Sequence, residues 1–164
     1  MKPEFSRPHR ADVIPRSGLT AELSATPEEC VAVAHRIGIP ALRSLVAKFR
    51  LHAIEGGAVV ASATLSARLV RECVVSLEAF ETTQRESFQL RFVPAGHEID
   101  DLDPESVDEI PFEDGVIDLG EAVVEQLALD LDPFPRMAGA TMPEAPETES
   151  VSPFAALAAL RAKR

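Results

Sequence analysis

The chain has 164 residues, of which 46% are hydrophobic, and this is enough for one domain with a core of its own. It has no Trp or Tyr and only eight Phe, so the core is expected to be mainly aliphatic. No apolar run approaches the roughly 18 residues of a membrane-spanning helix, and Met1 to Phe5 lack a hydrophobic signal region. The sequence therefore favours a cytoplasmic protein without a membrane partner.

The net charge of −11 is unevenly distributed along the chain. Residues 1–93 carry 12 Lys or Arg and 10 Asp or Glu, whereas residues 94–164 carry 4 and 17. Nucleic-acid-binding proteins usually present a basic surface, so any contact with RNA is expected to come from the first part. The two cysteines, Cys30 and Cys73, give no disulfide framework and are typical of a reducing compartment.

The N-terminal residues predict an extended arm followed by a strand. Pro3 and Pro8 exclude a helix over residues 3–14 and favour an arm or an edge strand. Residues 19–25 alternate apolar and polar side chains, which is the pattern of a strand with one buried face.

A helix is predicted from Pro27 to Arg36 or Ile37. Thr26 is the expected N-cap, Glu29 completes a capping box, and Gly38 ends the helix. The apolar stripe of this helix is expected to lie on a sheet and consists of Cys30, Val33, Ala34 and Ile37.

Residues 42–93 predict a three-stranded antiparallel meander, because apolar and polar side chains alternate with a period of two. A three-residue loop, Glu55-Gly56-Gly57, is expected between the first two strands, with a glycine at positive φ. This loop places only apolar residues opposite one another: Ala53 with Val59, Leu51 with Ala61, Phe49 with Ala63 and Ala47 with Leu65. The second turn, near Ser76 to Ala79, must contain an even number of residues if the third strand is to bury its apolar side chains on the same face.

The outward face of the meander is expected to be polar and moderately basic. In the predicted register Lys48 and Arg91 flank Thr64, and Arg50 and Arg68 lie on the same side. One interpretation is a charged face that keeps the protein in solution. The other is contact with the phosphates of structured RNA, with Lys48, Arg50, Arg68 and Arg91 as the contacting residues. The face lacks aromatic side chains on which single-stranded bases stack, which disfavours a sequence-reading RNA module.

Residues 94–114 hold nine Asp or Glu and no Lys or Arg. Self-repulsion and low hydrophobicity predict a mobile acidic loop, after which Gly115 to Ile117 can return briefly to the sheet. Asp118 then caps a second helix, with Glu121 three residues later. The apolar side of this helix is expected to dock on the core and consists of Val123, Val124, Leu127, Ala128 and Leu131.

Residues 136–152 are rich in Ala, Pro, Glu, Thr and Ser, which is typical of a disordered tail. Ser152 and Pro153 then begin a short amphipathic helix over residues 153–164. Its stripe is Phe154, Leu157 and Leu160. The stripe suits either packing on its own domain or docking in a groove of a partner, and the sequence leaves both open.

Cys73 is the strongest nucleophile candidate, and it is expected to be a buried, inert residue without a base beside it. The acidic run from Asp100 to Asp103 lacks the Gly and the distal Glu of a calcium loop and is interpreted as solvated linker. No glycine-rich phosphate loop, zinc motif or nucleophile elbow is present in the sequence. We therefore expect no metal site, no cofactor and no small-molecule substrate.

Four stretches have a common order and spacing that covers nearly the whole chain. They are Pro3-Glu4-Phe5-Ser6-Arg7-Pro8, Cys73-Val74-Val75-Ser76-Leu77-Glu78, Ile117-Asp118-Leu119-Gly120-Glu121 followed by Glu125-Gln126-Leu127-Ala128-Leu129, and Pro153-Phe154-Ala155-Ala156-Leu157. Together they resemble the YceD family, the large ribosomal RNA subunit accumulation proteins of bacteria and plastids. The resemblance implies a non-enzymatic role in the synthesis, processing or stability of large-subunit ribosomal RNA, but it supplies no molecular mechanism. Many members have a second cysteine three positions after the first, where this chain has Ser76, and one thiolate cannot close a zinc site.

The sequence thus predicts a single α+β domain over residues 1–135, with a mostly antiparallel sheet of four to five strands, two packed helices and a short tethered C-terminal helix. The favoured hypothesis is a ribosome-biogenesis accessory protein that acts by binding a ribosomal protein or pre-ribosomal RNA. Its acidic segment is a candidate for shielding a basic ribosomal protein before that protein meets RNA. Two alternatives stay open, an RNA-binding module acting through the basic sheet face and a cysteine-dependent enzyme.

Overall fold

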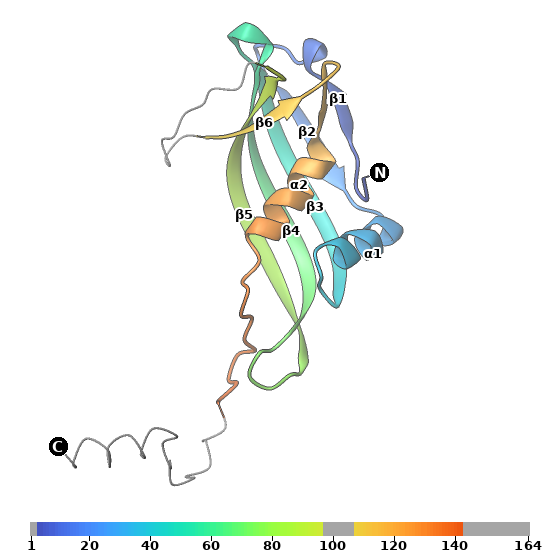
Figure 1. Ribbon diagram of the computed structural model, residues 1–164, viewed down its shortest axis with the longest axis vertical. Coiled ribbons are helices and arrows are strands. Elements are labelled where there is room, and N and C mark those ends of the chain that lie inside the picture. The colour runs from blue at the N-terminus through green and yellow to red at the C-terminus, as the bar shows by residue number, and fades with distance from the viewer. Residues whose placement is uncertain (1–2, 97–106, 143–164) are drawn as a thin grey trace, which may run out of the picture.

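The computed structural model describes residues 3–96 and 107–142, which form two sheets and two α-helices (Figure 1). The main sheet has five strands in the order β2-β3-β4-β5-β6, and only the β5–β6 pair is parallel. These strands are β2 (Leu19–Ser24), β3 (Ala41–Ala53), β4 (Val59–Glu72), β5 (Ala79–Pro94) and β6 (Asp108–Phe112). A second sheet pairs β1 (Pro8–Arg10) with β7 (Val116–Asp118). The predicted α+β class is confirmed, whereas the predicted helix over residues 153–164 lies outside the described residues.

The meander has the register that the alternation predicts. Phe49 pairs with Ala63, and the other three predicted pairs between β3 and β4 are also present. Glu55–Gly57 forms the connecting loop, in which both glycines have positive φ. Six residues separate Glu72 from Ala79 at the second turn, so the even number required by the pattern is confirmed. The apolar side chains of all three strands therefore share one face.

The position of Arg91 differs from the prediction. Arg91 lies opposite Val60, and Ser87 is the residue of β5 that lies opposite Thr64. The prediction that Lys48 and Arg91 flank Thr64 is therefore wrong for Arg91. Whether a residue number is odd or even determines the face of the sheet on which its side chain lies. A shift of four residues along the strand keeps every side chain on its face, so the alternation alone does not fix the partner of Thr64.

The fifth strand, β6, lies in the segment predicted to be a mobile acidic loop, so that prediction is wrong for residues 108–112. Ile110 and Phe112 pack against the core, and their spacing of two is the strand signal that the surrounding charges obscure. Pro111 is compatible with this strand because β6 is at the edge of the sheet. Asp114 and Gly115 both have positive φ and turn the chain into β7. This strand pairs with β1 and does not return to the main sheet.

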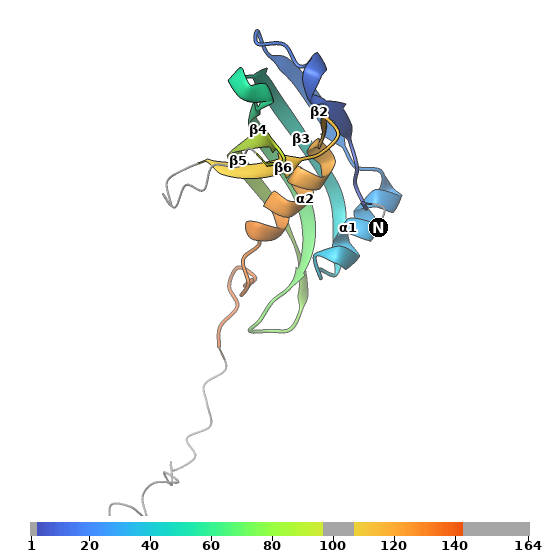
Figure 2. The same cartoon turned by 45° about the horizontal axis from the view of Figure 1, so that its top comes forward.

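The helices α1 (Pro27–Arg36) and α2 (Leu119–Leu129) cover the same face of the main sheet (Figures 1 and 2). The capping box between Thr26 and Glu29 is confirmed, with both hydrogen bonds formed. Helix α2 buries Val123, Val124 and Leu127 as predicted, but Ala128 is exposed. Leu119 and Ala122 are buried instead, so the buried part of α2 begins in its first turn. Neither helix has the length or the apolar content to span a membrane, and the described part of the chain has no other candidate.

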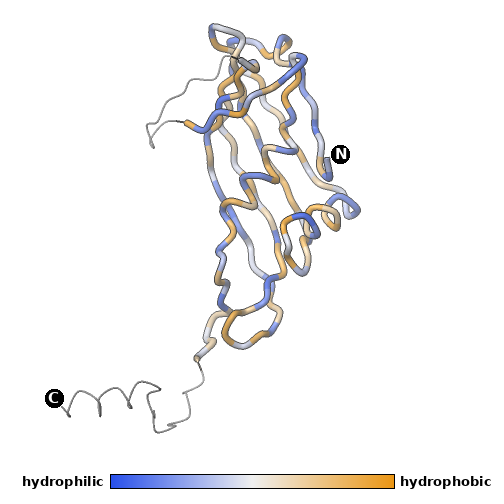
Figure 3. Tube along the Cα trace, in the orientation of Figure 1, coloured by the Kyte–Doolittle hydropathy of each residue, from blue (hydrophilic) through white to orange (hydrophobic). Residues whose placement is uncertain are grey.

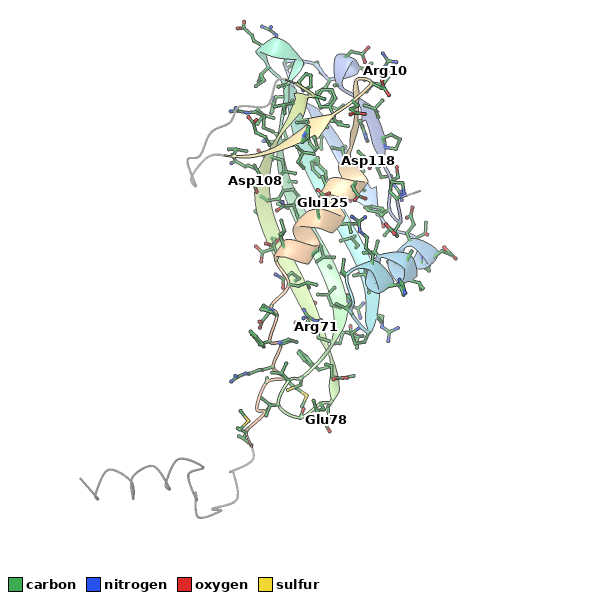
Figure 4. All side chains as sticks on the ribbon, in the orientation of Figure 1. Arg10, Arg71, Glu78, Asp108, Asp118 and Glu125 are labelled. Carbon is green, nitrogen blue, oxygen red and sulfur yellow. The ribbon has the colours of Figure 1, made fainter. Side chains whose placement is uncertain are left out.

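The N-terminal arm, residues 3–8, is fixed to the start of α2. The side chain of Phe5 is fully buried in the core. Asp118, labelled in Figure 4, accepts hydrogen bonds from the Arg7 N–H (2.8 Å) and the Ser6 hydroxyl (2.5 Å). The same carboxylate caps the helix by accepting the N–H groups of Gly120 and Glu121.

Asp118 is half-buried, and this opposes ionisation, yet its hydrogen-bond donors lower its pKa below the ordinary value. The main-chain N–H of Arg7 is the strongest of these donors. Because the folded-state pKa is depressed, the stabilisation from Asp118 is present above the ordinary Asp pKa and is lost as the pH falls through the depressed one.

Charged side chains hold the arm on both helices. Arg7 forms a two-pronged ion pair with Glu29 at the start of α1 (2.7 and 2.8 Å), and its guanidinium lies 4.4 Å from the centre of the Phe5 ring. Arg36, near the end of α1, pairs with Glu4 of the arm (3.0 Å) and with Glu121 of α2. The arm therefore joins α1 and α2, which are far apart in the sequence.

We predict that Gly120→Ala destabilises the fold by about 2 kcal/mol or more. A Cβ atom at this position would lie 2.3 Å from the main-chain carbonyl oxygen of Phe5, and the buried arm would have to move. Urea denaturation measures the effect, and Gln126→Ala on the same helix is the control. Equal stability of the two variants would contradict the close approach.

Candidate nucleic-acid interface on the outer face of the sheet

The outer face is the side of the main sheet that points away from the two helices. Along β3 and β4 most of the inward side chains are buried, whereas the alternating outward ones are exposed or half-buried. The outer face is formed by the outward side chains of β2 to β5, which include Thr20, Glu22, Lys48, Arg50, Ser62, Thr64, Ser66, Arg68, Arg85, Ser87 and Gln89. The alternation of side chains along each strand therefore gives the sheet one apolar and one polar surface.

Hydroxyl groups occupy the middle of the outer face. Ser62, Thr64 and Ser66 follow one another along β4, and Ser87 lies opposite Thr64 on β5. Thr20 belongs to the adjacent edge strand, β2. All of these side chains except Ser66 line a shallow hollow of about 530 Å³, with Lys48 and Arg50 at its β3 side. Hydroxyls and cations in such an arrangement are suited to contact the phosphates and sugars of a nucleic acid.

Three of the four predicted RNA-contacting cations are in ion pairs. Lys48 pairs with Glu22 at 3.3 Å and Arg68 with Glu81 at 2.5 Å, and all four of these side chains are largely exposed. Exposed pairs of this kind contribute about 0–1 kcal/mol and exchange partners readily. Arg91 pairs with Glu109 at 3.1 Å, and the Glu109 side chain is only 17% exposed. Arg91 therefore joins β5 to β6 through this ion pair and is less available to contact RNA than the exposed cations.

Arg50 and Arg85 form no ion pair with any residue in the described ranges. Arg50 is the fourth predicted contact residue, whereas the sequence analysis did not include Arg85. The side chain of Arg85 is exposed and lines a second hollow, of about 330 Å³, together with Lys48 and Thr64. Arg85, like Arg91, is an odd-numbered residue of β5, and the odd-numbered side chains of this strand lie on the outer face. Lys48 thus lines both hollows, one together with Arg50 and the other together with Arg85.

Two other sequence predictions lie outside the described residues. They are the stripe of Phe154, Leu157 and Leu160, and the acidic run from Asp100 to Asp103. Neither is placed by the structure, and the stripe stays a prediction.

Cys73 lies in the turn between β4 and β5, where its side chain is fully buried. The chain after α2 runs along this hairpin, and Figure 4 labels Arg71 and Glu78 beside it. Arg71 donates a hydrogen bond to the Asp132 carbonyl (2.7 Å), and the Met137 N–H donates to the Cys73 sulfur (3.3 Å). Arg71 and the Cys73 thiol thus hold the two ends of residues 132–137 against this hairpin.

Hydrogen bonds also change the acidity of this thiol. The Ser76 side chain, followed by the main-chain N–H groups of Ser76 and Met137, lowers the pKa of Cys73 to about 7. Burial, by contrast, raises the pKa of the Cys30 thiol on α1. The prediction that Cys73 is buried is confirmed, but its thiol is more acidic than an ordinary buried one.

The fold and the outer face define a sheet protein with one apolar side packed under helices and one open polar side. Among known families, the one described as large ribosomal RNA subunit accumulation protein YceD matches residues 61–161. No curated protein and no solved structure matches the chain. The family match covers more than half of the sequence, and the chain belongs to the YceD family.

We predict that Ser76→Ala raises the pKa of the Cys73 thiol from about 7 toward the ordinary value of about 8.5, because the strongest stabiliser of the thiolate is removed. The pH dependence of the ¹³Cβ chemical shift of Cys73 measures this pKa without a reagent having to reach the buried sulfur, and Ser17→Ala in a distant turn is the control. An unchanged midpoint in the Ser76 variant would show that this residue does not stabilise the thiolate.

Proposed function

We propose that this protein supports the accumulation of large-subunit ribosomal RNA by binding and not by catalysis, and that its outer face contacts the phosphates of pre-ribosomal RNA. The match to the YceD family supports the connection with this RNA. The observation that carries the binding mode is the grouping of Lys48, Arg50 and Arg85 around the hydroxyls of β4. The proposal includes the cytoplasm as the place of action.

The chemistry of the outer face supports recognition of structured RNA. Arg and Lys contact phosphates, and Ser and Thr hydroxyls both donate to and accept from ribose 2′-hydroxyls. The outward positions of the strands that the structure describes hold no Phe, so base stacking of the kind used by single-strand binders is not available there. Backbone contact then gives affinity for shape with little preference for sequence.

The strength of binding follows from the number of cations on the outer face that can contact phosphates. Three phosphate contacts release about three counterions, and the logarithm of affinity should fall with the logarithm of salt concentration with a slope of about −2 to −3. The ion pairs of Lys48 with Glu22 and of Arg68 with Glu81 open at little cost, so Arg68 can add a fourth contact. Such binding is weak in physiological salt and suits a transient assembly factor.

The burial of Cys73 argues against the cysteine-dependent enzyme. A thiol with no exposed surface does not reach a substrate in this conformation, and its hydrogen-bond partners are main-chain and Ser76 groups. The terminal stripe of Phe154, Leu157 and Leu160 remains a proposed partner-binding element. A pull-down with and without residues 153–164, in which bound RNA and protein are both identified, separates its contribution from that of the sheet.

We expect the triple variant Lys48→Gln, Arg50→Gln, Arg85→Gln to lose about tenfold or more in affinity for a structured fragment of large-subunit precursor RNA at low salt. The slope of the salt dependence should fall by about 2 to 3, because three phosphate contacts are removed. Binding is measured by fluorescence anisotropy over a range of salt concentrations.

The control for this experiment removes the same charge elsewhere, in Arg10→Gln, Arg16→Gln, Arg136→Gln. This variant should keep the wild-type slope, and all three proteins should have the same far-UV circular dichroism. If both triple variants weakened binding equally, the RNA would respond to net charge and the assignment to the outer face would be wrong.

A further inference from the structure

A further hollow, distinct from the two on the outer face, lies at the end of the main sheet where β3 turns into β4. This end hollow, of about 670 Å³, is bounded by the β3–β4 loop, the ends of β5 and β6, and the short 3-10 helix at Ala11–Val13. Its size is within the range of about 300–1,000 Å³ that ligand-binding hollows occupy. Figure 2 brings this end of the molecule forward.

The floor of the end hollow is apolar and belongs to the core of the protein. Ile14 is buried, and Ala53, Pro94 and Phe112 are half-buried beside it. Phe112 packs against the core, which fixes its ring at the base of the hollow. The packing of the core therefore holds the floor in place without a bound partner.

The rim of the end hollow is acidic. Asp12, Glu113 and Asp114 line it, and all three side chains are exposed. Arg10, labelled at this end in Figure 4, pairs with Asp12 at 2.5 Å and matches its charge. Glu113 and Asp114 form no ion pair with a described residue. Two unmatched carboxylates thus lie at the edge of an apolar floor.

We propose that the end hollow binds a basic polypeptide segment of another protein, with aliphatic stems of Lys or Arg on the apolar floor and their charged groups at Glu113 and Asp114. Long basic side chains are amphipathic in this sense, because their methylene stems pack on apolar surface while their heads stay in water. Nucleic acid does not fit the same site, because the carboxylates of the rim repel phosphates.

The outer face and the end hollow are separate surfaces with opposite charge. The outer face presents cations and hydroxyls, and the end hollow presents carboxylates, so one chain can hold a basic protein and RNA at separate places. The expected partners are the basic proteins that take part in ribosome assembly, and in this respect the inference rests on the proposed function. The binding chemistry of the hollow stands independently of it.

The test uses the full-length chain and a fluorescent twelve-residue peptide of Lys, Arg and Leu. A second peptide has Gln in place of every basic residue. At low salt we expect the basic peptide to bind at least about tenfold more tightly than the neutral one, with an affinity that falls as salt rises. Equal binding of the two peptides, or no binding of the basic one, would overturn the proposal.

Two variants locate the peptide on the protein. The double variant Glu113→Gln, Asp114→Asn should weaken binding about fivefold by removing the unmatched charges. Asn tolerates positive φ as well as Asp does, so the turn at Asp114 is kept. Ala95→Arg places a bulky cation in the hollow from an exposed position and should weaken binding further.

The matched controls lie at the opposite end of the hairpin, in exposed positions. Glu72→Gln, Glu78→Gln removes the same charge, and Ala79→Arg adds the same side chain. Both controls should bind the peptide like the wild type. Peptide binding that is unchanged in both hollow variants, or equally reduced in the controls, would place the peptide elsewhere and overturn the proposal.

Measuring RNA binding of the same proteins separates the two proposals. The hollow variants should bind the structured RNA fragment at least as tightly as the wild type, while the outer-face triple variant should keep its affinity for the basic peptide. Loss of RNA affinity in Glu113→Gln, Asp114→Asn would assign this end of the protein to RNA and overturn the peptide site. Loss of RNA binding in the outer-face variant alone leaves the hollow proposal supported.

Discussion

The period of two along the central strands is the constraint on which the rest of the structure depends. It sends Phe49, Leu51 and Leu65 into the core and leaves Lys48, Arg50 and Thr64 on the opposite side. Because a slip of one residue would exchange the two faces, burial of the apolar side also fixes the composition of the polar side. The outer face exists as a coherent surface because the core holds its register. Figure 3 shows the alternation of hydropathy along the chain that produces both faces.

A second set of contacts joins the N-terminal arm to the start of α2. Phe5 fills the core, and Gly120 lets its main chain approach the helix. Asp118 satisfies the N–H groups of both the arm and the helix start with one carboxylate. These residues hold the fold together, and their chemistry needs no ligand. The functional surfaces lie elsewhere, on the outer face and at the end hollow, where packing constrains the side chains less.

Sequence reasoning predicted those parts of the fold that local signals control. The capping box at Thr26, the turn at Gly56 and the pairing of Phe49 with Ala63 all follow from spacing and backbone preference. It did not predict β6, because this strand has only two inward apolar residues, Ile110 and Phe112, and they lie within an acidic run. The pairing of β7 with β1 depends on contacts more than 100 residues apart, which a local pattern does not contain.

The candidate site was predicted only in part, for the same physical reason. Parity placed Lys48 and Arg50 correctly on the outer face, but the position of a residue along β5 depends on the length of the second turn. This is why Arg85 was missed and Arg91 was placed beside Thr64. The ion pair of Arg91 with Glu109 depends in turn on β6. The end hollow combines segments from four parts of the chain and has no local signature.

The central claim is that the outer face, and not the helical side, meets the RNA. Nuclear magnetic resonance of the full-length protein during titration with a structured fragment of large-subunit RNA tests it most directly. The account predicts that shift changes concentrate at Lys48, Ser62, Thr64 and Ser87, with little change at Val33 and Leu127 beneath the helices. Shift changes centred on the exposed surfaces of α1 and α2, with the outer face unaffected, would contradict it.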